Sequence, residues 1–220
     1  MDEVAKDFAE AFALAGRGCC ALYLISPQEV GGGFPDQLKA ALEPGLATAF
    51  QLRVKDTPED ELARLAEPLQ RTCADAGVAF IVNDSMALAK RIGADGVHLG
   101  QGDGDVREAR VLLGPSAQIG KTCHDSRHLA MEAGEVGADY VAFGAFHPTT
   151  TKPSQYRPDP SILTWWSTLF EIPCVAIGGI TAANATPLIE AGADFLAVCQ
   201  AVWGKDDPEA AVRAFAEVLS

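Results

Sequence analysis

Residues 78–99 have the sequence VAFIVNDSMALAKRIGADGVHL, and this stretch decides the class of fold. The apolar run Val78–Val82 predicts a buried strand, Met86–Arg91 predicts a short helix, and Gly96–Leu99 predicts a second strand. A helix that joins two strands of one sheet forms a right-handed crossover, which makes the strands parallel. The stretch therefore predicts an α/β protein with a parallel sheet.

The same alternation extends along nearly the whole chain, with amphipathic segments such as Glu59–Ala76 between short apolar runs. We expect eight strands: Ala21–Ile25, Ala47–Leu52, Val78–Val82, Gly96–Leu99, Ala117–Gly120, Tyr140–Phe143, Cys174–Ile177 and Phe195–Val198. Eight such units in 220 residues predict a single (β/α)8 TIM barrel. A doubly wound open sheet is the alternative, but no GxGxxG turn follows the first strand.

The first residues have a different character. Val4, Phe8 and Phe12 recur at helical spacing among acidic residues, which predicts a short amphipathic helix. We expect an N-terminal helical extension over residues 1–18 and the barrel over residues 19–220.

Three related segments precede expected strands: Gly93-Ala94-Asp95, Gly137-Ala138-Asp139 and Gly192-Ala193-Asp194. A glycine can adopt the left-handed conformation that ends a helix, and an Asp side chain can bond the backbone of the turn that follows. We interpret these segments as structural features of the barrel's lower rim.

Charge and composition exclude several classes of partner. The net charge of −13 argues against nucleic-acid binding, which needs a basic face. The chain has no apolar run of the roughly 18 residues that a membrane span needs, and no signal-peptide pattern. The six cysteines lack CxxC spacing, which favours buried free thiols and a cytoplasmic protein over disulfides or a metal site. Barrels of this size often pair, so a homodimer is a further expectation.

Polar residues follow the second strand, where barrel enzymes place their active sites. Gln51, Arg53 and Lys55 alternate with apolar residues and so share one face of the strand. Two cations facing inward would be costly unless they bind an anion or pair with neighbouring carboxylates.

Carboxylates follow the next two strands. Asn83-Asp84 ends the third, and Asp103 comes shortly after the fourth. Adjacent strand ends lie about 5 Å apart, so the two Asp side chains can approach one another and hold Mg²⁺ beside a phosphorylated substrate. Capping of the following helix is the alternative role for Asp84, whereas we interpret Asp105 as an early helix residue.

The remaining strand ends add further candidates. Lys121, Thr122 and His124 follow the fifth strand; Lys121 as a Schiff-base nucleophile and His124 as a general base are both open. The loop that ends in Thr149-Thr150-Thr151-Lys152 suits a pyrophosphate clamp. Gly178 and Gly179, ahead of a helix near Ala182, suit a phosphate site formed by backbone N–H groups.

The ordered set LYLI, QLRVK, VND, DGVHLGQGD, DYVAFGAFHPTTTK, PCVAIGGI and GADFLAV resembles the thiamine phosphate synthase family over about residues 20–215. The resemblance implies condensation of 4-amino-2-methyl-5-hydroxymethylpyrimidine diphosphate with a thiazole phosphate, with release of pyrophosphate. The pyrimidine C–O bond breaks early, and the thiazole nitrogen captures the resulting cation. Such a reaction depends on stabilising the leaving group more than on a base.

The resemblance also implies roles for the residues above. Mg²⁺ lies on Asp84 and Asp103, and Arg53, Lys55 and Lys152 neutralise the diphosphate as the catalytic residues. The implied substrate-binding residues are Gln51, Asn83, Thr122, His124, Thr149, Thr151, Gly178, Gly179, Cys199 and Gln200.

The chain departs from the family pattern at several places. Ser85 replaces an Arg, Lys121 replaces an apolar residue, and Cys199-Gln200 replaces a small residue followed by a hydroxyl. Ser26-Pro27 also stands where hydroxyl-Asp is usual. The alternatives are a thiazole tautomerase of the same superfamily, for which His124 would be the shared residue, and a catalytically silent phosphate-binding barrel. Retention of the Asp pair and of the PTTTK loop favours the synthase.

Overall fold

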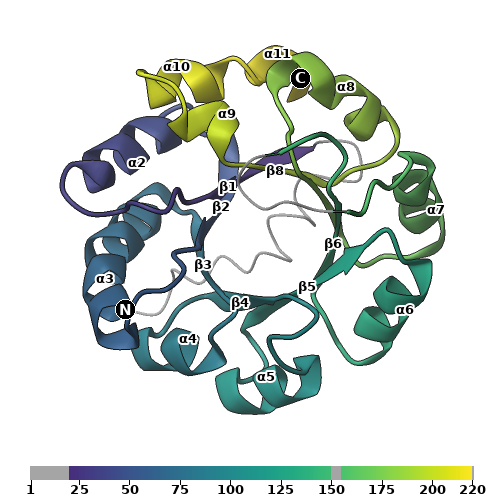
Figure 1. Cartoon of the computed structure of the whole chain (residues 1–220), viewed down its shortest axis with the longest axis horizontal. Helices are drawn as coiled ribbons and strands as arrows, with labels where there is room; N and C mark the ends of the chain where they lie inside the picture. Colours follow the sequence, from purple (N-terminus) through teal and green to yellow (C-terminus); the bar gives the residue numbers. More distant parts are fainter. Residues whose placement is uncertain (1–19, 150–154, 220) are drawn as a thin grey trace.

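Eight parallel strands close into a barrel in the order of the sequence (Figure 1). The computed structural model describes residues 20–149 and 155–219, so the expected N-terminal helix lies outside the described residues. The strands are β1 (Ala21–Ile25), β2 (Ala47–Leu52), β3 (Ala79–Asn83), β4 (Gly96–Leu99), β5 (Gln118–His124), β6 (Tyr140–Gly144), β7 (Cys174–Ile177) and β8 (Phe195–Val198). The expected TIM barrel is confirmed.

Pairing of the first strand with the last closes the sheet. β1 pairs with β8 from Ala21↔Phe195 to Leu24↔Val198, and on its other edge β1 pairs with β2. Closure leaves no exposed edge strand, and it places the carboxyl end of every strand on the same rim.

Helices surround the barrel (Figure 1). They are α2 (Phe34–Leu42), α3 (Glu59–Ala76), α4 (Met86–Ile92), α5 (Val106–Leu113), α6 (Arg127–Glu135), α7 (Ser161–Leu169), α8 (Ala182–Glu190), α9 (Gln200–Trp203), α10 (Pro208–Arg213) and α11 (Ala216–Leu219). α3 has the expected bounds, and its buried stripe is Leu62, Ala66, Leu69 and Cys73. None of the helices that the structure describes is both long and apolar enough to cross a membrane.

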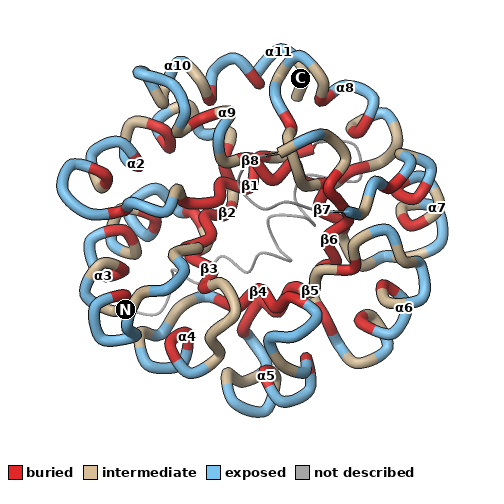
Figure 2. The backbone as a smooth tube through the Cα atoms, in the orientation of Figure 1, coloured by how far each residue is buried: buried red, intermediate tan, exposed pale blue. Residues whose placement is uncertain are grey.

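The core has two layers. Between the strands and the helices lies a large apolar cluster, visible in Figure 2 as buried segments on the inward sides of the helices. Inside the barrel lies a smaller cluster that includes Tyr23, Ala49, Ile81, Tyr140 and Phe195. The described cysteines are free thiols, as expected; Cys199 is half-buried and the others are buried.

The three Gly-Ala-Asp segments have the structural role expected of them. Gly93, Gly137 and Gly192 all have positive φ, as the turn after a helix requires. Each Asp side chain then accepts a hydrogen bond from a backbone N–H at the start of the preceding strand. The bonds are Asp95 with Phe80 N (2.7 Å), Asp139 with Ile119 N (2.6 Å) and Asp194 with Cys174 N (2.8 Å). The same hydrogen bond, from a backbone N–H to an Asp side chain, thus occurs on the lower rim at the starts of β3, β5 and β7.

Strand β5 differs most from its expected bounds, because it ends at His124 and not at Gly120. Lys121 and Thr122 pair with Val141 and Ala142 of β6, and the register shifts before His124 pairs with Phe143. Lys121, Thr122 and His124, which were expected to follow the strand, are therefore part of it. The shift is the local irregularity of a β-bulge, which re-aims side chains near active sites.

We expect Asp194→Ala to lower the free energy of unfolding by about 1–3 kcal/mol, because it leaves the buried N–H of Cys174 without its side-chain acceptor. Urea unfolding measures this change. Asp206→Ala, at an exposed position, is the matched control and should have almost no effect. Equal stability of the two variants would contradict the role given to Asp194.

Candidate active site

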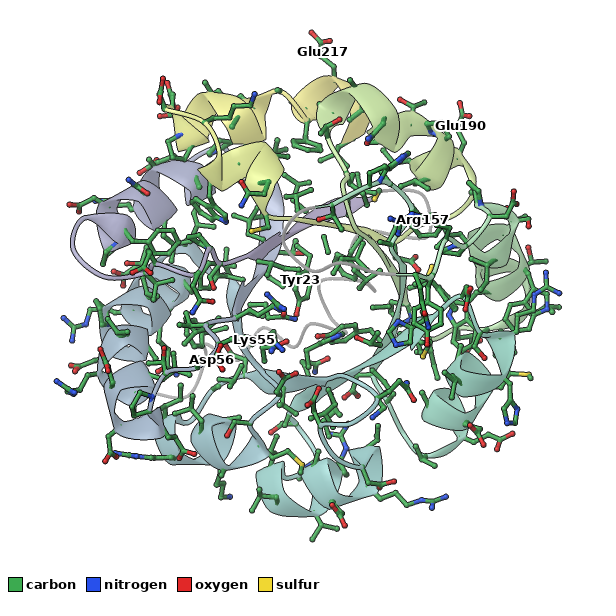
Figure 3. The ribbon with its side chains drawn as sticks, viewed as in Figure 1. Tyr23, Lys55, Asp56, Arg157, Glu190 and Glu217 are labelled. Carbon is green, nitrogen blue, oxygen red and sulfur yellow. The ribbon has the colours of Figure 1, made fainter. Side chains whose placement is uncertain are left out.

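The end of β2 and the chain beyond it form one wall of the barrel mouth. Gln51 is only 3% exposed, and its Nε2 donates to Tyr23 Oη at 3.0 Å. Beyond the strand, Arg53 N donates to Ser26 Oγ at 2.8 Å. Gln28 binds the backbone of Lys55 twice, accepting from its N–H (3.1 Å) and donating to its carbonyl (2.7 Å). Residues after β1 therefore hold the segment with the two cations, and Figure 3 shows Tyr23 and Lys55 inside the ring of strands.

Asp84 and Asp103 follow neighbouring strands, and the charge of Asp103 acts on Asp84. Asp84 follows β3 with a φ of 65°, and its carboxyl group lies near enough to that of Asp103 for the two to interact electrostatically. Burial raises the pKa of Asp84; the hydrogen bond with Asp103 and its charge raise it further, while Lys55 and Arg53 act in the opposite direction. Lys55 Nζ lies 3.7 Å from Asp84 Oδ2.

The carboxylate pair fits a hard divalent cation. Two neighbouring carboxylates either share a proton or bind a positive charge. Within residues 20–149 and 155–219, no group of three or more His, Cys, Asp or Glu residues could hold a metal ion. Two oxygen ligands still suit Mg²⁺, which usually keeps several waters and takes substrate phosphate oxygens as well.

The helix after β3 is capped by Ser85, and so capping does not explain Asp84. Ser85 Oγ accepts from Leu88 N at 3.0 Å, which is the bond of an N-cap residue. The expected alternative role of Asp84 is therefore wrong. Asp105 is the N-cap of α5, accepting from Arg107 N and Glu108 N, one position earlier than an early helix residue.

On β5, the neighbouring candidates have different surroundings. Lys121 Nζ donates to the carbonyl oxygens of Gly100 (2.8 Å) and Gly104 (2.9 Å), a bonded arrangement that argues against a free Schiff-base amine. Thr122 Oγ1 lies 2.8 Å from His98 Nε2. The ring of His124 stacks on Tyr156, with centroids 4.1 Å apart and a 20° angle between the planes.

A chain of buried side chains, which the sequence analysis missed, joins two sides of this site. Gln51 Nε2 bonds Tyr23 Oη, which lies 2.9 Å from Tyr140 Oη. Tyr140 Oη in turn lies 3.1 Å from His98 Nδ1, and the other ring nitrogen, His98 Nε2, bonds Thr122. Tyr23, Tyr140 and His98 are all buried. Their inward alternation along the strands could have revealed them, since polar side chains on the inside of a barrel need partners there.

The opposite side of the mouth contains the glycines. Gly178 (φ 100°) and Gly179 (φ 65°) follow β7, and a side chain on either would collide with the chain after β6, at Ala145 or at His147 and Pro148. Close approach of two backbones therefore requires both glycines, whether or not a phosphate binds there. His147 Nε2 is buried without a hydrogen-bond partner among the described residues, a candidate that the sequence analysis also missed.

The last candidates lie at the ends of several different strands. Cys199 is half-buried and its Sγ donates to Ser26 O at 3.5 Å, while Gln200 is exposed at the start of α9. Asn83 ends β3, and Thr149 is half-buried after β6. Thr151 and Lys152 lie outside the described residues, so their roles stay predictions.

A barrel mouth with a carboxylate pair, nearby cations and a glycine-lined opposite wall defines a (β/α)8-barrel site for an anionic small molecule. The family model described as thiamine monophosphate synthase matches residues 22–202, and the chain belongs to this family. The thiamine-phosphate synthase of Erythrobacter litoralis is 64% identical over 203 residues, which cover 90% of this chain and 95% of the relative. That of Rhodospirillum centenum is 54% identical, with 91% and 98% covered.

A solved structure has the same architecture. The thiamine phosphate pyrophosphorylase from Pyrococcus furiosus superposes with a TM-score of 0.81 at 30% identity, covering 92% of this chain and 96% of that one. The fold and the family thus agree.

The series of buried, hydrogen-bonded side chains predicts that the contributions of Tyr23 and Tyr140 to stability are coupled. Tyr23→Phe and Tyr140→Phe each keep the ring but remove a hydroxyl that faces the other at 2.9 Å. We expect each single variant to lose about 1–2 kcal/mol of stability, and the double variant to lose less than the sum, because the second change removes a hydroxyl that has already lost one of its two partners. Urea unfolding of the four proteins measures the cycle, and strictly additive losses would contradict a shared network.

Proposed function

We propose that the chain condenses 4-amino-2-methyl-5-hydroxymethylpyrimidine diphosphate with a thiazole phosphate, giving thiamine phosphate and pyrophosphate. It would thus be a transferase acting on small phosphorylated heterocycles. The observation that most supports this function is the position of Lys55 Nζ, 3.7 Å from Asp84 Oδ2, where the charge of Asp103 also acts on Asp84. The names of the relatives support the same activity.

The proposed chemistry is stabilisation of a leaving group. As the pyrimidine C–O bond breaks, negative charge grows on the pyrophosphate, and cations fixed beforehand stabilise it without reorganisation. Arg53 and Lys55 supply this charge from the segment that Ser26 and Gln28 hold. Lys152 would add a third cation from the loop after β6.

Mg²⁺ would supply further charge neutralisation for the diphosphate when it is bound at Asp84 and Asp103. Burial, and next the nearby Asp103, raise the pKa of Asp84, and a bound cation would favour the ionised form against both effects. The donor set is all oxygen, which suits Mg²⁺ better than a soft metal.

The substrate rings and phosphates have proposed contacts around this centre. Gln51 and Asn83 would bind the pyrimidine diphosphate, and the Thr122 hydroxyl would donate to a pyrophosphate oxygen. Thr149 and Thr151, and the amides of Gly178 and Gly179, would bind phosphate oxygens. His124, Cys199 and Gln200 would line the side where the thiazole phosphate enters. A cytoplasmic location and a homodimer are part of the same proposal; the free thiols support the location.

The assay that tests the function mixes both phosphorylated heterocycles with the protein and Mg²⁺ and follows pyrophosphate release. We expect stoichiometric pyrophosphate and thiamine phosphate. Isomerisation of the thiazole carboxylate phosphate without pyrophosphate would instead identify a tautomerase, and binding without either product a silent barrel.

We expect Asp84→Ala and Asp103→Ala each to reduce Mg²⁺-dependent kcat/KM by about 100-fold or more, as for loss of a group that stabilises the transition state. Their circular dichroism should be that of the unchanged barrel. Asp75→Ala, at an exposed position of α3, is the matched control. Full activity of both site variants at limiting Mg²⁺ would refute the metal assignment.

A further inference from the structure

The loop between β4 and α5 has an unusual amount of backbone freedom for a segment that positions a proposed metal ligand. Its residues 100–105 have the sequence GQGDGD, with glycine at every second position before Asp105. Glycine has more accessible backbone conformations than any other residue, so holding such a loop in one conformation costs more entropy. Asp103 lies in the middle of this loop, and its placement needs outside support.

Lys121 provides bonds at both ends of the loop. It lies on β5 opposite Leu99, the last residue of β4, so its side chain starts beside the point where the loop begins. From there Nζ reaches Gly100 O at 2.8 Å and Gly104 O at 2.9 Å, one residue on the far side of Asp103. A single ammonium group thus joins the two ends of the turn.

The loop's other bonds each hold one point only. Asp103 N donates to Gly100 O at 3.3 Å, a long bond across the same turn. Gln101 Nε2 donates to Thr122 O, and Asp105 caps α5. Of these bonds, those of Lys121 alone fix both the start and the end of the turn to the neighbouring strand. The ammonium also adds positive charge near a carboxylate that faces another carboxylate.

We propose that Lys121 is a positioning residue, which fixes the 100–104 turn so that Asp103 stays against Asp84 in the arrangement that binds a divalent cation. The inference rests on the proposed function of the two carboxylates. Lys121 itself bonds to backbone carbonyls, so its role is exerted through Asp103. Partners that orient a metal ligand typically change metal affinity by 10–100-fold when they are removed.

The test measures cation binding directly, with Mn²⁺ as the probe and the water-proton relaxation rate as the signal. Lys121→Met keeps the length of the stem but removes the donors. We expect its dissociation constant for Mn²⁺ to rise by about tenfold, the lower end of that range. Lys39→Met, on the exposed face of α2, removes the same charge elsewhere and should bind as the unchanged protein does.

A second measurement distinguishes a positioning role of Lys121 from a general loss of catalytic activity. The Mg²⁺ concentration that gives half-maximal pyrophosphate release should rise in Lys121→Met by a similar factor, while kcat at saturating Mg²⁺ stays within about threefold of the unchanged protein. Lys121→Arg, which keeps N–H donors, should recover most of the affinity. If Lys121→Met does not fold, Lys121→Gln, too short to reach both carbonyls, replaces it.

The variant Asp103→Asn distinguishes a failure of the Lys121 proposal from a failure of the metal assignment. If Asp103→Asn weakens Mn²⁺ binding and the Lys121 variants do not, the role of Lys121 is overturned while the metal site stands. If Asp103→Asn also binds Mn²⁺ normally, the metal assignment itself fails and the inference falls with it.

Discussion

Closure of the barrel through the β1–β8 pairing is the constraint on which the remaining structure depends. With eight parallel strands in one closed sheet, every carboxyl end lies on one rim and every amino end on the other. Residues that are separated by most of the chain, such as Cys199 and Ser26, thereby come into contact. The two rims then have different roles: the lower one uses Asp95, Asp139 and Asp194 to fix strand starts, and the upper one gathers the cations and carboxylates.

The sequence was sufficient for the barrel because each strand is a short apolar run and each amphipathic segment has a clear period. It also identified which strand ends bear charge, so the approach of Asp84 and Asp103 followed from strand order alone. The extent of β5 could not be predicted, because its polar residues are paired with β6 through a shift in register, which depends on the partner strand. Local capping was similarly ambiguous, and the structure assigns it to Ser85.

Contacts across the barrel were the least predictable part. Whether Tyr23 meets Tyr140, 117 positions later, depends on strand tilt and on the side chains between them. The bonds of Lys121 to the β4–α5 turn depend on the length of one flexible side chain in a crowded space. No periodicity in the sequence encodes such a distance, and both features lie beside the residues that family resemblance had already singled out.

The buried side chains joined by hydrogen bonds have a consequence for how one bond depends on another. A tyrosine hydroxyl can donate as well as accept, so rotating the Gln51 amide by half a turn would require Tyr23 and Tyr140 to reverse the direction of their own bonds. The polarity of these bonds is therefore a property of the whole series, from Gln51 on β2 to Thr122 on β5, and not of any single side chain.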